Sequence, residues 1–118
     1  MFQIMPESKD KTVGIKASGW LIDSDYKELV PKIDKMIEEK GELKFLLDIK
    51  DLKGFSCRAM MDDLKFCIKY KDKMKKIAVV GHSKWEEACT DMCKPFMPEA
   101  MKYFDVADEP KAWDWLRE

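Results

Sequence analysis

Arginine is scarce in this chain, and so is net charge. Of the 22 basic residues only Arg58 and Arg117 are arginine, and the formal net charge is −1. Bidentate reading of phosphate and guanine favours arginine, and a nearly neutral chain creates no overall field that would attract nucleic acid or an anionic membrane. Both features argue against a nucleic-acid-binding protein.

Long apolar runs are also missing. No run approaches the roughly 20 residues of a membrane-spanning helix. The first residues, MFQIMPESKDK, lack the basic start and the apolar core of a signal peptide. We therefore expect no transmembrane segment and a cytoplasmic protein, in which the cysteines remain thiols. These are Cys57, Cys67, Cys89 and Cys93.

No catalytic motif is recognisable. His82 is the only histidine, and it could form a thiol–imidazole–carboxylate set with Cys57 and Asp51 only if their loops converge. Nothing local to these residues resembles a cysteine hydrolase motif. Cys89 and Cys93 lie four residues apart on a predicted helix, and their spacing from His82 matches no common zinc pattern, so core packing is the better interpretation. We expect no enzyme, no cofactor and no metal.

What is present is a single domain over residues 1–118, with 46% apolar and 38% charged residues. Its central stretch begins with the near-continuous apolar run Leu43–Ile49, which is typical of a strand buried on both faces. Asp51–Gly54 is predicted as a turn, and Ser56 as the N-cap of an amphipathic helix.

The segments before this stretch predict a hairpin and a helix. Phe2–Met5 and the alternating Thr12–Leu21 should pair as strands. Asp23 or Ser24 should cap a helix that stops at Gly41, with Pro31 allowing a kink or a later start. Its apolar stripe is Tyr26, Leu29, Val30, Ile33 and Ile37.

The segments after it repeat the alternation of strand and helix. Ile77–Val80 and Glu99–Phe104 are predicted strands. Ser83 should open a third helix, and Asp108 should cap a fourth whose inner residues are Ala112, Trp113 and Leu116. The fold class is therefore α/β: a mixed, mostly parallel sheet of about five strands with about four helices and an N-terminal hairpin.

Several motifs together resemble the SpoIIAA-like family, a group of small domains related to STAS domains and compared with CRAL-TRIO lipid-binding domains. The motifs are Ala17-Ser18-Gly19, Leu46-Leu47-Asp48 with Gly54-Phe55-Ser56, Asp63-Leu64-Lys65-Phe66, Ile77-Ala78-Val79-Val80-Gly81 with Lys84-Trp85, Pro95-Phe96, Tyr103-Phe104-Asp105, and Ala112-Trp113 with Trp115-Leu116. The resemblance covers nearly the whole chain. It implies the superhelical β–α architecture of STAS domains and a regulatory, partner-binding role.

In the anti-sigma-factor antagonists of the wider group, a serine at the start of the second helix is phosphorylated. The resemblance places Cys57 near that position, with Ser56 just before it. The group's Asp-Ser-Ser/Thr-Gly pattern is absent, because Phe55-Ser56-Cys57-Arg58 stands there. Ser56 is thus either a phosphoacceptor or a plain N-cap. Cys57 is either a reactive thiol or a small, half-buried residue.

The carboxyl ends of parallel strands gather at one edge of a sheet, where ligands bind in open α/β folds. The candidate ligand or partner edge consists of Trp20, Asp51, Phe55, Ser56, Cys57, Met60, Met61 and His82, with Gly81 and Asp105 close by. Our first hypothesis is a non-catalytic module that binds a protein partner or a second copy of itself at this edge. The alternative is a carrier of a small apolar ligand, which would require a closed cavity lined by Met and Phe.

Overall fold

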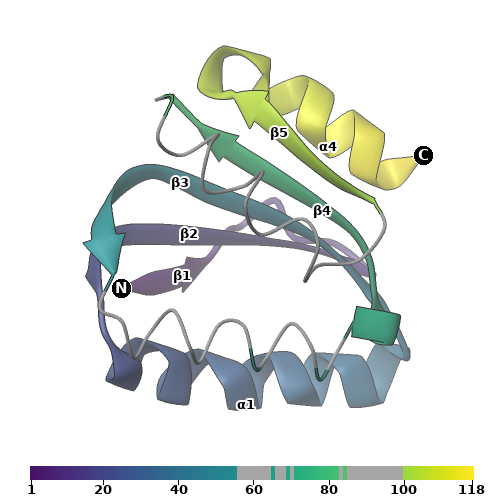
Figure 1. The fold of residues 1–118 in the computed structure, drawn as a ribbon. Coiled ribbons are helices and arrows are strands. Elements are labelled where there is room, and N and C mark those ends of the chain that lie inside the picture. The colour runs from purple at the N-terminus through teal and green to yellow at the C-terminus, as the bar shows by residue number, and fades with distance from the viewer. Residues whose placement is uncertain (56–64, 66–68, 70, 83, 85–99) are drawn as a thin grey trace.

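The computed structural model describes residues 1–55, 65, 69, 71–82, 84 and 100–118. Five strands form one sheet in the order β1-β2-β3-β4-β5 (Figure 1). Their bounds are β1 (Phe2–Ile4), β2 (Thr12–Leu21), β3 (Leu43–Phe55), β4 (Met74–Gly81) and β5 (Met101–Asp105). β1 runs antiparallel to β2, and every other neighbouring pair is parallel. The predicted mixed sheet with its N-terminal hairpin is confirmed.

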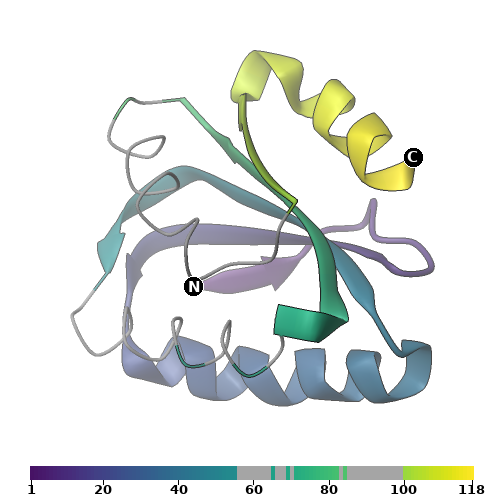
Figure 2. The same cartoon turned by 45° about the vertical axis from the view of Figure 1, so that its right-hand side comes forward.

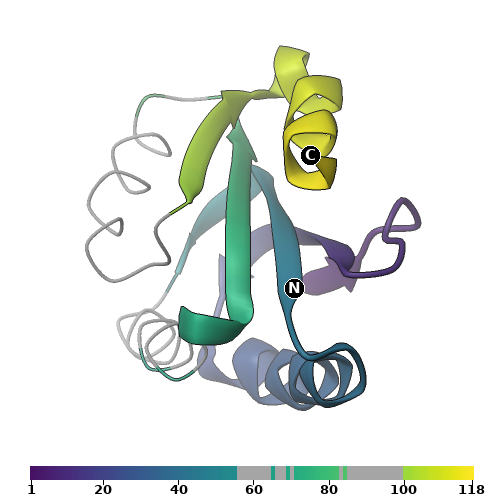
Figure 3. The same cartoon turned by 90° about the vertical axis from the view of Figure 1, so that its right-hand side faces the viewer.

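A helix lies against each face of the sheet, as Figures 1 and 3 show for α1 (Asp23–Lys40) and α4 (Glu109–Arg117). The larger core lies on the α1 face and includes Val13, Ile33, Leu43 and Val79. The smaller core lies on the α4 face and is built from Leu46, Ala78, Val80, Ala112, Trp113 and Leu116. Because successive strand residues point to opposite faces, the apolar run of β3 serves both cores, as a strand buried on both faces should.

β3 is longer than the sequence suggests. We predicted a strand that ends at Ile49 and a turn over Asp51–Gly54, but the strand continues to Phe55. It stays paired with β2 because it inserts extra residues at two irregularities, one between the pairs Lys16–Asp48 and Ser18–Asp51 and one before Gly54. Bulges of this kind let turn-like residues remain inside a ladder.

Helix α1 begins at Asp23, so the suggested later start after Pro31 is wrong, and the proline lies inside the helix. Neither Asp23 nor Ser24 is the N-cap. Ile22 occupies that position, and Asp25 Oδ2 accepts a hydrogen bond from the Ile22 N–H at 2.9 Å. Gly41 ends the helix with a positive φ of 82°, as predicted.

The last strand runs from Met101 to Asp105, so the predicted segment Glu99–Phe104 is shifted. A short 3-10 turn, η3 (Val106–Asp108), follows, and Asp105 Oδ1 accepts a hydrogen bond from the Ala107 N–H at 3.0 Å. Asp108 is the N-cap of α4, as predicted, although its side chain makes no capping hydrogen bond there. The predicted inner residues of α4, Ala112, Trp113 and Leu116, are all buried.

The two remaining predicted helices lie almost wholly outside the described residues. Within those segments Lys65, Lys69 and Lys84 are helical, and a 3-10 turn, η1 (Lys71–Lys73), leads into β4. Of the helices that the structure does describe, none is both long and apolar enough to cross a membrane.

Candidate functional site

The carboxyl edge of the sheet is stepped. Asp48 pairs with Val80 near the end of β4, but β3 continues beside β2 for several further residues, with Trp20 opposite Gly54. β2 and β3 therefore project beyond β4 and β5, and they turn toward the start of α1 (Figure 2). These two strands carry the part of the predicted site that projects farthest beyond β4 and β5.

Trp20 is the most prominent side chain on this projection. Its residue exposure is 61%, while the next residue, Leu21, is only 3% exposed and points into the larger core. The Trp20 ring lies over the neighbouring strand, because a Cβ built at Gly54 would be only 2.6 Å from its ring atom Cζ3. Ile22 follows with 47% exposure. Two large apolar side chains are thus presented to solvent at one corner.

Asp51 and His82 lie behind this corner and are held by neighbouring groups. The Asp51 carboxylate is 3.1 Å from the Lys16 ammonium, which connects β3 to β2. His82 Nε2 is 2.7 Å from the main-chain oxygen of Lys50, which connects the end of β4 to β3. Both contacts hold the edge together and give these side chains a structural role.

Asp48 is the buried charged residue of the central strand, with 1% exposure. Its Oδ1 accepts a hydrogen bond from the Lys50 N–H at 3.1 Å, and its Oδ2 lies 3.3 Å from Lys50 Nζ. The Asp48 carboxylate raises the pKa of Lys50 above its ordinary value of 10.5, and Glu109 and Asp51 act in the same direction while desolvation opposes them. A buried charge needs such a partner, because leaving it unpaired would cost several kcal/mol.

The structure places three of the predicted site side chains at this edge: Trp20, Asp51 and His82. Phe55 is the last residue of β3 and pairs with Leu21. Ser56, Cys57, Met60 and Met61 lie outside the described residues, so the phosphoacceptor and the reactive thiol stay predictions. Among the described residues, no group of three His, Cys, Asp or Glu side chains is arranged to hold a metal ion.

Two members of the corner were missed by the sequence reasoning. Ile22 is an apolar residue between a strand and a helix, and nothing in the local pattern distinguishes it from a core position. Gly54 was assigned to a turn, whereas it lies in a strand and leaves room for the Trp20 ring. The sequence offered one signal for this position. A single glycine inside a strand often marks a place where another group packs closely against the backbone.

Comparison with known proteins agrees with the motifs in the sequence. Residues 12–117 match the SpoIIAA-like family. This chain belongs to the SpoIIAA-like family. No protein of curated function matches it.

Solved structures of the same fold include an uncharacterised DUF3478-family protein from Shewanella loihica PV-4. It is 31% identical, with a TM-score of 0.80 over 98% of this chain and 92% of that one. The anti-sigma factor antagonist SpoIIAA, in its unphosphorylated form, is 18% identical, with a TM-score of 0.70 over 99% and 98% of the two chains. An anti-sigma factor antagonist from Mycobacterium paratuberculosis is 13% identical, with a TM-score of 0.62 over 100% and 96%. At these last two identities the likeness shows the fold alone.

Proposed function

We propose that this SpoIIAA-like domain is a cytoplasmic, non-catalytic interaction module that binds a protein partner at the corner formed by Trp20 and Ile22. The observation that carries the proposal is the 61% exposure of Trp20 on the projecting end of β2. Tryptophan is enriched among the few interface residues that supply most of the binding energy, because it buries a large area with little loss of conformational freedom.

The support of the corner favours a preformed binding surface. Trp20 rests against the backbone at Gly54, and the strand beneath it is fixed by the Lys16–Asp51 ion pair and by the His82–Lys50 hydrogen bond. A surface that is rigid before binding loses less entropy when it binds. Two structures that share the fold are described as anti-sigma factor antagonists, and that description is consistent with a partner that is itself a protein.

The direct test is site-specific photo-crosslinking in the producing organism. Trp20 is replaced by a photoreactive phenylalanine analogue, and a matched strain carries it at Lys111, whose side chain is 78% exposed on α4. We expect a discrete crosslinked protein from position 20 and none from position 111. The same products from both positions would contradict the proposal.

The affinity of the captured protein then provides a second measurement. Trp20→Ala should weaken binding by about 2 kcal/mol or more, as for a central interface tryptophan, and Lys111→Ala should leave affinity unchanged. Circular dichroism establishes that both variants are folded. Unchanged binding by the Trp20→Ala variant would remove Trp20 from the interface.

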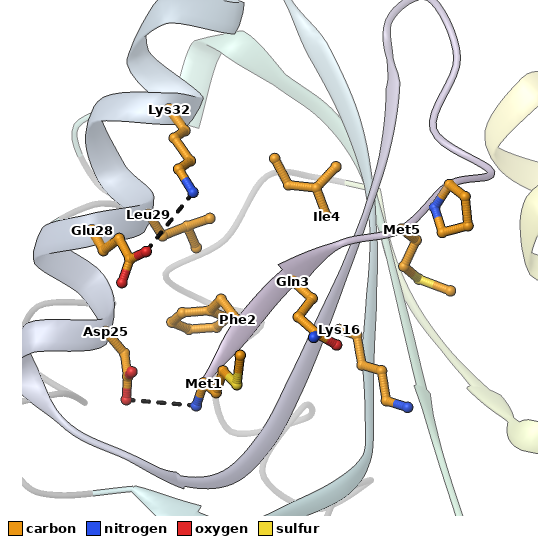
Figure 4. A pocket seen from close by; sticks show the side chains of 11 residues that line it. Met1, Phe2, Gln3, Ile4, Met5, Lys16, Asp25, Glu28, Leu29 and Lys32 are labelled. Carbon is orange, nitrogen blue, oxygen red and sulfur yellow. Dashed lines mark ion pairs between the residues drawn. The ribbon is translucent and has the colours of Figure 1, made fainter.

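The alternative function is that of a carrier of a small apolar ligand, and it makes a different prediction. A groove lies between β1 and α1, and its lining includes the charged residues Lys16, Asp25, Glu28 and Lys32 (Figure 4). Such a lining suits a polypeptide better than a lipid chain. Native mass spectrometry of the freshly purified chain separates the two functions, because bound mass of lipid size would favour the carrier.

A further inference from the structure

β1 is the outermost strand on its side of the sheet, and its outer backbone groups face away from every described strand. The Met5 N–H donates to the Gly14 oxygen at 2.8 Å, and the Ser18 N–H donates to the Met1 oxygen at 2.9 Å. These bonds, with Gln3 opposite Lys16, show that the backbone groups of Met1, Gln3 and Met5 point toward β2. Since backbone groups alternate along an antiparallel strand, the N–H and C=O groups of Phe2 and Ile4 point outward.

An apolar strip accompanies this open edge. A groove of about 640 Å³ lies between β1 and α1, lined by Phe2, Ile4 and Leu29 among others (Figure 4). The Phe2 ring packs edge-on against Tyr26 with centroids 5.0 Å apart, whereas Ile4 is 40% exposed. Open backbone donors and acceptors beside exposed apolar side chains form a template for another β-strand.

We propose that this edge is occupied by a second copy of the chain. Two β1 strands would pair antiparallel across a two-fold axis through Gln3, and the two sheets would become continuous. In this register Phe2 lies opposite the partner's Ile4. Both residues direct their backbone groups outward, so the pairing places donors opposite acceptors and leaves the bonds to β2 untouched.

The side chains agree with this register. Phe2 and Ile4 stand opposite Ala17 and Ile15, which belong to the core on the α1 face, so both point to that face. In the dimer each exposed Ile4 would therefore lie against the partner's Phe2, and apolar cross-strand pairs of this kind are stabilising. Gln3 would face the partner's Gln3 on the other side of the sheet, where an amide offers both a donor and an acceptor.

The charges beside the groove favour a second copy over an unrelated strand. Glu28 and Lys32 both line the groove, and on α1 the Glu28 Oε1 and Lys32 Nζ atoms lie 3.9 Å apart. The Met1 amino group is 3.6 Å from the Asp25 carboxylate. From Met1 to Gln3 the strand advances by two residues, or about 7 Å. From Asp25 to Leu29 the helix advances by four residues, or about 6 Å. Gln3 therefore lies close to the level of Leu29, between Glu28 and Lys32. A two-fold axis there places Lys32 on the side of the partner's Glu28 and brings opposite charges together.

The first test is the mass of the full chain by sedimentation equilibrium over a dilution series. We expect a dimer that dissociates on dilution. Ile4→Pro removes an outward N–H without breaking a bond to β2, so it should raise the dissociation constant by about tenfold or more. Ile4→Val keeps the N–H and the β-branched shape and should leave the constant unchanged. A chain that is monomeric throughout, or a dimer that is insensitive to Ile4→Pro, would overturn the proposal.

A second test does not depend on how the proline variant folds. Gln3 lies on the axis as a non-hydrogen-bonded pair, where Cα atoms are about 4.5 Å apart, within the range that a disulfide spans. Gln3→Cys should form a disulfide-linked dimer under mild oxidation much faster than Glu7→Cys, with the unaltered chain as the background for the native cysteines. Equal rates for the two variants would exclude this register. Trp20→Ala should still dimerise, so the outcome is independent of the proposed partner site.

Discussion

Gly14 and Trp113 are in contact across the interface between β2 and α4. A Cβ built at Gly14 would lie 2.6 Å from the Cη2 atom of the Trp113 ring and 3.0 Å from the Met5 side chain. Trp113 is 6% exposed, so its ring has little room to move. Helix α4 can rest this close to the sheet because residue 14 has no side chain.

Gly14→Ala should therefore destabilise the fold by overpacking, by about 1–3 kcal/mol. The measurement is the free energy of unfolding in urea. Trp113→Phe removes part of the ring that the new methyl group would meet, so the double variant should lose less than the sum of the two single variants. Strictly additive losses would contradict the expected clash between the new methyl group and the Trp113 ring.

The ion pair between Asp48 and Lys50 should make stability depend on alkaline pH. Because the pKa of Lys50 is raised in the folded chain, its contribution is fully present below the ordinary value of 10.5 and is lost as the pH rises through the folded pKa. Asp48→Asn removes the largest cause and should flatten this loss, although it lowers stability at neutral pH.

The matched control for that experiment is Asp108→Asn, since Asp108 pairs with Lys111 on the surface at 3.7 Å. Urea midpoints at pH about 9 and about 11 compare the three proteins. The control should lose as much stability as the unaltered chain over this interval. If the Asp48→Asn variant does so too, the pair does not govern the alkaline loss.

The sequence predicted the elements of this fold better than their ends. The apolar run Leu43–Ile49 identified the central strand because burial on both faces leaves an unbroken pattern. Asp51 and Gly54 have the composition of a turn, but pairing with β2 outweighs this local preference. Both residues stay in the ladder, opposite Ser18 and Trp20, with an irregularity of the register before each of them. Three acidic or hydroxyl residues follow Ile22, and composition alone could not show that Ile22 is the N-cap and that Asp25 accepts its N–H.

The candidate site was predictable in outline and not in detail. Strand order places Trp20, Asp51 and His82 at one edge, and this follows from β–α alternation. The exposure of Trp20 depends on how far β3 extends and on the small size of Gly54. Both are properties of the tertiary pairing, so no pattern within β2 could reveal them.

Trp20 and Trp113 should differ sharply in their contribution to stability. Trp20→Ala should change the free energy of unfolding by no more than about 0.5 kcal/mol, as for a surface residue. Trp113→Ala should cost about 3–5 kcal/mol, because it empties part of the smaller core. Thermal and urea unfolding of both variants test this contrast. A large loss with Trp20→Ala would mean that the ring is structural and would weaken the case for a binding surface.

Asp105→Ala should loosen the start of the C-terminal segment. The Asp105 carboxylate accepts the Ala107 N–H, and removing such a cap typically costs about 1 kcal/mol. Asp105→Asn retains an acceptor and should recover most of the loss. Amide hydrogen exchange at Ala107 provides the local measurement, and unchanged protection there in the alanine variant would contradict the role given to Asp105.

The order of the strands in the sheet is the order of the strands in the chain. Each strand that leaves the ribosome can therefore join the edge completed just before it, and none has to wait for a later segment to be inserted between its neighbours. Domains fold during synthesis at a rate limited by about 5–20 residues per second. The sheet of this domain can be assembled from its first strand to its last, and the arrival of α4 at the end closes the second face.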